Sequence, residues 1–156
     1  MSTLTQSKSA SRTQAGGGIA SFLGPRSEGA FAALRIVAGL AFGFHGLQIL
    51  FGVMLPPEMV PKAMTQAWFG GIIELVTGIA IAAGAFTSWV AFLASGTMAV
   101  AYMQFHWQFA FNSKFFPAAN QGEMSLIYCF LFLYMACRGG GIFSIDAIRN
   151  PLQTRN

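Results

Sequence analysis

Four ionisable side chains stand inside or beside apolar stretches of the sequence, and their types suggest a shared site. His45 lies in the run FGFHGLQILFG, Glu74 in a second apolar run, His106 near the end of a third, and Glu123 at the start of a fourth. An ionised group costs roughly 2.5 to 3.5 kcal/mol at the centre of a membrane helix, so such residues are candidates for function. Two imidazoles and two carboxylates in one cavity could bind a metal ion, relay protons or hydrogen-bond a quinone-like head group.

The composition is typical of an integral membrane protein. Hydrophobic residues make up 54% of the 156 residues and charged residues only 9%, whereas soluble domains carry about 25% charged residues. The formal net charge is +4, but the basic residues gather toward the two ends of the chain instead of forming one patch. We therefore exclude nucleic-acid binding and interpret the charge as a signal of membrane topology.

Four apolar stretches have the length expected of membrane helices, which need about 20 residues. They cover residues 29–52, 67–86, 89–109 and 120–138. The predicted fold class is all-α, an integral membrane four-helix bundle with both termini cytoplasmic. The predicted parts are a disordered, basic N-terminal tail (1–28), the transmembrane domain (29–146) and a short C-terminal tail (147–156). The segment IFSIDAIRN is expected to lie along the membrane interface.

The predicted topology places the four ionisable groups on one side of the membrane. Lys and Arg are in excess in the first and last segments, which the positive-inside rule assigns to the cytoplasm. At about 1.5 Å of rise per residue, His45 and Glu74 each lie about 10 Å from the outer ends of their helices. His106 lies about 5 Å from its outer end, and Glu123 begins the fourth helix on the same side. The outer half of the bundle is therefore the predicted site.

Each of these residues also has a structural interpretation. His106 fits an interfacial position beside Trp107, and Glu123 would favour a helix N-terminus through the helix dipole. Glu74 is the hardest to explain in this way, because it lies seven residues into its span with no cation nearby. The spacings match no compact ligand motif, so metal or haem binding is not favoured. Tyr102 and Trp107 are candidates for stacking on a bound ring.

Arg35 belongs to the opposite, cytoplasmic half of the first helix. It lies about 9 Å from the inner end, and Gly39, Phe42 and Gly46 follow it on one helical stripe, which predicts a buried face. A pairing of Arg35 with Asp146 would form a structural clamp at the inner side. The alternative is that Arg35 extends to the cytoplasmic interface.

Small residues recur at spacings of three and four in the second apolar stretch. Such stripes allow the backbone of another helix to approach closely. The predicted stripe contains Gly70, Glu74, Gly78, Ala82 and Ala85.

Five short motifs, taken in order, resemble the DoxX family of small bacterial membrane proteins. The first helix reads LRIVAGLAFGFHGLQILFG and the second WFGGIIELVTGIAIAAGAFT; MAVAYMQFH, NQGEMSLIY and GGGIFSID follow. The resemblance covers about Arg35 to Asp146. The chain departs from the family pattern at Ile49, where a lysine is common, and at Gln121, where a glycine is common.

The resemblance implies a multi-pass protein of the bacterial inner membrane. Some relatives are associated with thiosulfate:quinone oxidoreductase or with sulfur-redox assemblies, so it suggests the membrane subunit of a quinone- or sulfur-linked redox system. Glu74, Glu123 and His45 would then transfer protons, and Tyr102, His106 and Trp107 would contact the ligand with them.

The expected partners are the lipid bilayer, a quinone or another small hydrophobic ligand, and a partner redox protein. The alternative function is a non-enzymatic module that anchors or stabilises a partner protein. A transport pathway is a third interpretation, and it would call for a homodimer.

Overall fold

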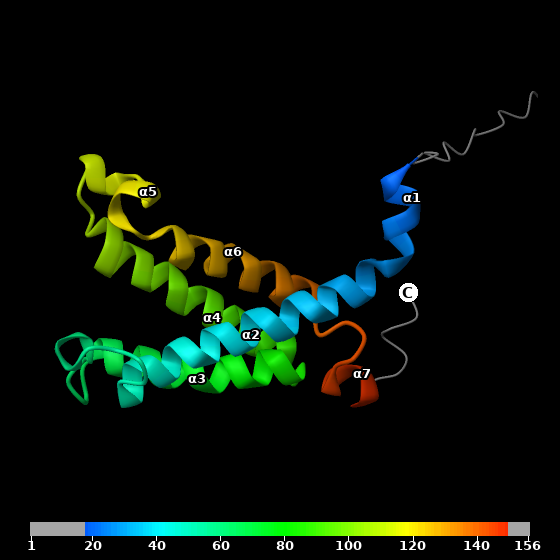
Figure 1. Cartoon of the computed structure of the whole chain (residues 1–156), viewed down its shortest axis with the longest axis horizontal. Helices are drawn as coiled ribbons and strands as arrows, with labels where there is room; N and C mark the ends of the chain where they lie inside the picture. Colours follow the sequence, from blue (N-terminus) through cyan, green and yellow to red (C-terminus); the bar gives the residue numbers. More distant parts are fainter. Residues whose placement is uncertain (1–17, 150–156) are drawn as a thin grey trace, which may run out of the picture.

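A computed structural model describes residues 18–149 of the chain (Figure 1). Within this range the secondary structure is helical and contains no strands, which confirms the all-α prediction. The longer helices are α2 (Ser27–Phe51), α3 (Gln66–Ala83), α4 (Thr87–Ala101) and α6 (Glu123–Arg138). The shorter segments are α1 (Ile19–Leu23), η1 (Gly24–Arg26), η2 (Pro57–Met59), the π-helical η3 (Tyr102–Trp107), η4 (Ser113–Phe115), α5 (Pro117–Asn120) and α7 (Ile145–Arg149).

The helical structure begins earlier than the sequence predicts. It starts at Ile19, ten residues before the predicted start at Gly29, so the described part of the predicted tail is helical. Pro25 falls at the start of η1, where its missing N–H costs no intrahelical hydrogen bond. The remainder of the predicted N-terminal tail, residues 1–17, and the end of the C-terminal tail, residues 150–156, lie outside the described residues.

Two further boundaries differ from the prediction. The third stretch is regular α-helix only to Ala101, after which the chain widens into the π turn of η3. The fourth stretch does not run unbroken from Asn120, because Gln121 has a left-handed conformation with φ 60°. This residue ends α5, and α6 begins afresh at Glu123. A residue in that conformation cannot continue a right-handed helix.

The four longer helices pack mainly as two pairs. Helix α2 packs against α3, and α4 packs against α6, while α3 and α4 contact each other across a tight turn. The two pairs lie close together near α7 and diverge toward the end that carries η3, η4 and α5 (Figure 1). A cluster of buried apolar side chains fills the region where the pairs meet, and it includes Phe42, Ile81, Met98 and Phe132.

Glycines bring the backbones of α2 and α3 into direct contact. A Cβ atom added to Gly39 would lie 2.5 Å from the backbone nitrogen of Ala82, and one added to Gly46 would lie 2.5 Å from that of Leu75. A Cβ at Gly78 would collide with the backbone of Gly43. These separations leave no room for any side chain, so only glycine permits this approach.

The buried face predicted for the first helix is confirmed, because Arg35, Gly39, Phe42 and Gly46 are all buried. The predicted stripe on the second helix is only partly in the contact. Gly78 meets α2, but a Cβ at Gly70 would meet nothing within 4 Å. The neighbouring Gly71 packs against α2 in its place, where it faces Ile49.

Large apolar side chains cover the outward faces of the longer helices. They include Val37, Leu40, Val76, Ile79, Phe92, Ile127 and Phe130. Within residues 18–149, two helical segments are long and apolar enough to cross a membrane, Ile19–Phe51 and Gln66–Ala83. Apolar surface of this extent is rare on soluble monomers and is typical of a protein that contacts lipid or another apolar partner.

The contact between α2 and α3 predicts an unusual response to alanine. In the variant Gly46→Ala, the added methyl group collides with the backbone of α3, and overpacking of this kind lowers the free energy of unfolding by about 1–3 kcal/mol. The matched control is Gly29→Ala in the same helix, where a Cβ meets nothing within 4 Å. Thermal unfolding in detergent, followed by circular dichroism, should show a lower midpoint for Gly46→Ala alone. An unchanged or raised midpoint would contradict the close contact, since alanine otherwise favours a helix.

Candidate functional site

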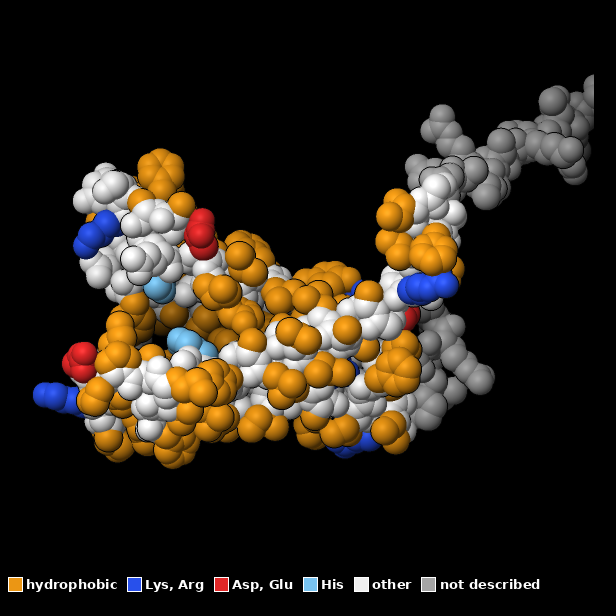
Figure 2. Space-filling view, in the orientation of Figure 1, with side chains coloured by type: hydrophobic (Ala, Val, Ile, Leu, Met, Phe, Trp, Pro, Cys, Tyr) orange, Lys and Arg blue, Asp and Glu red, His pale blue; other side chains and the backbone are white. Residues whose placement is uncertain are grey.

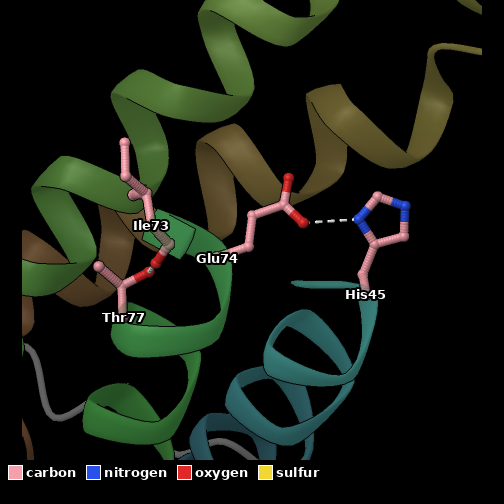
Figure 3. A network of polar contacts seen from close by, with 4 residues as sticks. All are labelled: His45, Ile73, Glu74 and Thr77. Atoms are coloured by element: carbon pink, nitrogen blue, oxygen red, sulfur yellow. Dashed lines mark hydrogen bonds and ion pairs between the residues drawn. The ribbon is translucent and has the colours of Figure 1, made fainter. Parts of the chain in front are cut away.

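His45 and Glu74 form a direct polar contact between α2 and α3 (Figure 3). Nδ1 of His45 lies 2.6 Å from Oε2 of Glu74. The Glu74 side chain is only 5% exposed, whereas that of His45 is 59% exposed. The acid is therefore enclosed by the protein, and the imidazole covers it on the open side.

The glycine contact positions this pair. Glu74 lies between Gly71 and Gly78 on the face of α3 that meets α2, and His45 is adjacent to Gly46 on the facing helix. One turn further along α3, Thr77 donates a hydrogen bond of 2.6 Å to the carbonyl oxygen of Ile73 and so needs no other partner (Figure 3). The sequence predicted similar depths for His45 and Glu74, and the structure brings the two side chains together.

A cavity of about 1110 Å³ lies beside the His45–Glu74 pair. Its walls come from α2, α3, α4, η3 and the start of α6. Figure 2 shows the hollow between the two diverging parts of the molecule, with hydrophobic walls and the two histidines of the chain at its sides. An apolar cavity with a few convergent polar groups is the usual form of a small-molecule site.

His106 supplies a second imidazole to the same cavity. It lies in the π turn of η3, and its Nδ1 is 3.1 Å from the carbonyl oxygen of Asn120. A carbonyl oxygen only accepts, so Nδ1 of His106 carries the proton and Nε2 has a free lone pair in the neutral ring. Nδ1 of His45 is likewise engaged, by Glu74. Both histidines are thus held through Nδ1 and leave Nε2 for a ligand.

Three residues predicted for the site do not line the cavity. Tyr102 donates its hydroxyl to the carbonyl oxygen of Phe115 at 3.1 Å, although its ring lies stacked beside that of His106. Trp107 donates to the carbonyl oxygen of Ala110 at 3.1 Å and packs in an aromatic cluster of the loop that follows η3. Glu123 is exposed on the first turn of α6. The chain's local turns, which the sequence spacing did not predict, direct these side chains elsewhere.

Polar residues that the sequence analysis did not select also line the cavity. From the start of α6 and the turn before it come Gln121, Ser125 and Tyr128, and Gln48 comes from α2. Ser125 and Tyr128 are three positions apart on α6, which places them on one helical face, whereas Gln121 precedes that helix. This spacing of three was the signal in the sequence that could have identified Ser125 and Tyr128 as neighbours on one face. Within residues 18–149, no group of three or more His, Cys, Asp or Glu side chains is arranged to hold a metal ion.

At the other end of the molecule, near α7, the Arg35 side chain donates hydrogen bonds to backbone carbonyl oxygens. The side chain is fully buried, and its Nη1 donates to Ile81 at 2.7 Å and to Ala82 at 2.6 Å. Its Nη2 donates to Phe143 at 2.7 Å. The last carbonyls of a helix have no intrahelical partner and carry partial negative charge, so the end of α3 stabilises this cation.

Asp146 does not form the predicted ion pair with Arg35 among the described residues. Its two carboxylate oxygens instead accept hydrogen bonds of 2.8 Å from the backbone N–H groups of Phe86 and Thr87. Asp146 thereby caps the start of α4, where Phe86 has no side-chain cap of its own. Its own N–H donates to Gly84. Arg35 and Asp146 therefore hold the same turn from two sides without touching.

The fold and the site together define a class of protein. The chain is a helical, membrane-associated protein with apolar outer faces, two helices suited to crossing a bilayer, and a cavity that carries a histidine–glutamate pair. The family model for DoxX matches residues 30–107, which run from α2 through η3. The chain belongs to the DoxX family, as its motifs predicted.

One relative from the curated proteins supports this assignment. The chain is 36% identical over 117 residues to an uncharacterized protein of Haemophilus influenzae, and the match covers 74% of this chain and 87% of the relative. No solved structure matches the chain significantly.

The capping role of Asp146 predicts a pH-dependent stability. Partial burial by itself would raise the pKa of this carboxyl group, but the N–H groups of Thr87 and Phe86 and the charge of Arg149 outweigh it, so the pKa is lowered. A carboxylate with a lowered pKa in the folded state contributes stability above its unfolded pKa of about 3.9. This contribution to stability is lost as the pH falls through the pKa that Asp146 has in the folded protein.

The corresponding test compares Asp146→Asn with the wild type. At pH 7 the substitution should cost about 1 kcal/mol or more, because the amide of asparagine replaces one of the two acceptor oxygens with a donor and leaves one N–H unpaired. The difference should shrink as the pH falls below about 4. Thermal unfolding in detergent from pH 7 to pH 3 measures it. Glu58→Gln, in the exposed η2 segment, is the control and should show no such change. A wild-type advantage that is as large at pH 3 as at pH 7 would contradict this role of the carboxylate.

Proposed function

We propose that the chain is a multi-pass protein of the bacterial inner membrane whose cavity binds a quinone-like head group. In this proposal α2, α3, α4 with η3, and α6 cross the membrane as a four-helix bundle, and both termini are cytoplasmic. The protein then acts as the membrane subunit of a redox system in which a partner protein supplies electrons. The contact of His45 with Glu74 at the wall of an apolar cavity is the observation that carries the proposal.

The polar groups of the cavity suit a quinone head group. A quinone offers two carbonyl oxygens that accept hydrogen bonds, and its reduced form offers two hydroxyl groups that donate them. Nε2 of a protonated His45 donates to a carbonyl oxygen, while Nε2 of neutral His106 accepts from a hydroxyl group. The apolar remainder of the cavity excludes water and strengthens these hydrogen bonds.

The buried carboxylate of Glu74 allows His45 to take part in proton transfer. Reduction of a quinone to a quinol takes up two electrons and two protons. When His45 carries the positive charge, Glu74 stabilises it across the 2.6 Å contact. The imidazolium can then pass its Nε2 proton to the reduced oxygen and recover a proton from the open side, where its side chain is 59% exposed. Electrons come from the partner protein.

The test measures binding directly. Purified protein in lipid nanodiscs is titrated with ubiquinone-1, and binding is followed by quenching of tryptophan fluorescence. Glu74→Gln and His45→Ala should each weaken binding roughly tenfold or more, because each removes one side of a charged hydrogen bond at the wall of the cavity. Glu58→Gln, an exposed glutamate that does not line the cavity, is the matched control and should bind as the wild type does.

The measurements also separate this proposal from an anchoring function. If the protein only anchors or stabilises a partner, substitutions of His45 and Glu74 should lower its abundance or thermal stability and leave quinone binding absent or unchanged. Affinity purification would then recover a partner protein in stoichiometric amount. Substitution of these residues would reduce the amount of partner that is recovered and would leave catalytic turnover unchanged. Unchanged binding in both variants at equal protein levels would sink the assignment of this site.

A further inference from the structure

The helical segment Ile19–Phe51 is too long to lie wholly inside a membrane as one straight helix. Its 33 residues would rise about 50 Å, whereas the hydrocarbon core of a bilayer is about 30 Å thick. A segment that is longer than the core tilts or bends. Helix α2 alone has 25 residues, which rise about 37 Å and suffice to cross the core. When α2 crosses a membrane, α1 and η1 are therefore left at its surface.

Helix α1 does not continue along the axis of α2. It turns away steeply at η1, which contains Pro25, at the same end of the molecule as α7 (Figure 1). Because α1 runs across the direction of α2, it runs along the surface of a membrane that α2 crosses. The bend thus keeps this short helix close to the lipid instead of extending it into water.

The exposed side chains of α1 are apolar on one side. Ile19, Phe22 and Leu23 are 75%, 62% and 48% exposed, and their spacing of three and four positions places them on one face. No residue of α1 is buried against the other described helices. A helix of five residues is not stable in water by itself, since short helices depend on the packing of an apolar face. This face therefore needs an apolar environment from outside the described part of the chain.

Arg26 gives the same segment a positive charge. Its Cζ atom lies 4.2 Å from the centre of the Phe22 ring, its Nη1 donates to the carbonyl oxygen of Phe22, and among the described residues it pairs with no carboxylate. The sequence before α1 adds Lys8 and Arg12 and contains no acidic residue. Figure 2 shows hydrophobic side chains over α1 and a basic side chain beside it. An apolar face flanked by positive charge is typical of segments that bind anionic lipid surfaces.

Other exposed aromatic side chains lie at this end of the molecule. Trp89, on the first turn of α4, is 79% exposed, and Phe86 just before that helix is 57% exposed. The Cζ atom of Arg149 lies 4.8 Å from the centre of the Phe86 ring. Tryptophan and basic side chains are enriched where a membrane meets water. The end that carries α1 and α7 therefore has the side chains of a membrane interface.

We propose that α1 and η1 bind the surface of a membrane that contains anionic phospholipids. Ile19, Phe22 and Leu23 insert between the lipids at the boundary of head groups and acyl chains, and Arg26 pairs with a lipid phosphate. In the proposed topology this surface is the cytoplasmic leaflet. The inference concerns a surface outside the cavity, so it does not depend on what the cavity binds.

Hydrogen–deuterium exchange of the full chain in nanodiscs tests this inference. One set of nanodiscs contains phosphatidylcholine alone, and the other contains equal parts of phosphatidylcholine and phosphatidylglycerol. Exchange is followed in peptides that cover residues 19–26, with peptides from α3 as the internal reference. The variants are Arg26→Gln and Phe22→Ser. The matched controls are Lys62→Gln and Phe111→Ser, which replace an exposed basic and an exposed aromatic residue at the opposite end of the molecule.

In the wild type, the amides of residues 19–26 should exchange about fivefold more slowly in the anionic nanodiscs, which is the contribution of one basic side chain near an anionic surface. Arg26→Gln should lose most of this difference between the two lipid mixtures. Phe22→Ser should exchange faster in both, because the apolar contact is common to both. The two control variants should exchange as the wild type does.

Three results would overturn the inference. The first is wild-type exchange in residues 19–26 that is the same in both lipid mixtures. The second is slow exchange that Arg26→Gln or Phe22→Ser retains in full. The third is slow exchange that appears only in nanodiscs that hold two copies of the chain, which would assign the apolar face to a second copy. A nanodisc presents the same lipids on both faces, so these outcomes are independent of the proposed orientation and of quinone binding.

Discussion

The direct backbone contact between α2 and α3 determines the position of every polar group on that side of the cavity. Helices in lipid gain little from burying apolar surface against each other, so close packing and interhelical hydrogen bonds decide how they associate. Gly39 and Gly46 lie against the backbone of α3, and Gly78 lies against that of α2. This contact allows one register, and in that register His45 meets Glu74. A shift of one turn would move the imidazole about 5.4 Å along the helix and leave the carboxylate unpaired.

The two ends of the molecule differ because their polar groups are satisfied differently. At the end near α7, Arg35 binds three carbonyl oxygens and Asp146 caps α4, so a few hydrogen bonds hold α3, α4 and the C-terminal segment together. A buried cation is tolerated only with such partners. Among the described residues, the side-chain hydrogen bond between the pairs at the opposite end is that from Gln66 to Gln104, and there the pairs diverge around the cavity (Figure 1). The helical pairs are therefore held together at the end near α7 and lie apart at the end that contains the cavity.

The unequal burial of His45 and Glu74 bears on their chemistry. A carboxylate that is 5% exposed favours a positive charge beside it, and an imidazole that is 59% exposed can exchange protons and contact a ligand. Two equally buried groups would hold each other in a closed pair, and two exposed groups would interact only weakly. The arrangement therefore joins an enclosed carboxyl group to an imidazole that is open on its other side.

The sequence by itself determined the all-helical fold, the buried stripe that follows Arg35, the family, and the matching positions of His45 and Glu74 along their helices. These properties follow from composition, helical periodicity and short motifs, which are local along the chain. Only the tertiary structure decided which polar residues share the cavity. Tyr102, Trp107 and Glu123 are close to His106 in the sequence or in the predicted depth, yet the π turn and the left-handed residue Gln121 turn them away.

Arg35 and Asp146 form two separate sets of hydrogen bonds in place of the expected ion pair. This difference also depends on the tertiary structure. Arg35 and Asp146 have opposite charges, and charge alone predicts that they pair. The unsatisfied carbonyls at the end of α3 and the uncapped N–H groups at the start of α4 compete for them at shorter range. Those groups come together only when the tight turn has formed, so periodicity along the chain could not reveal them. The sequence determined which groups needed partners, and the folded backbone decided which partners they found.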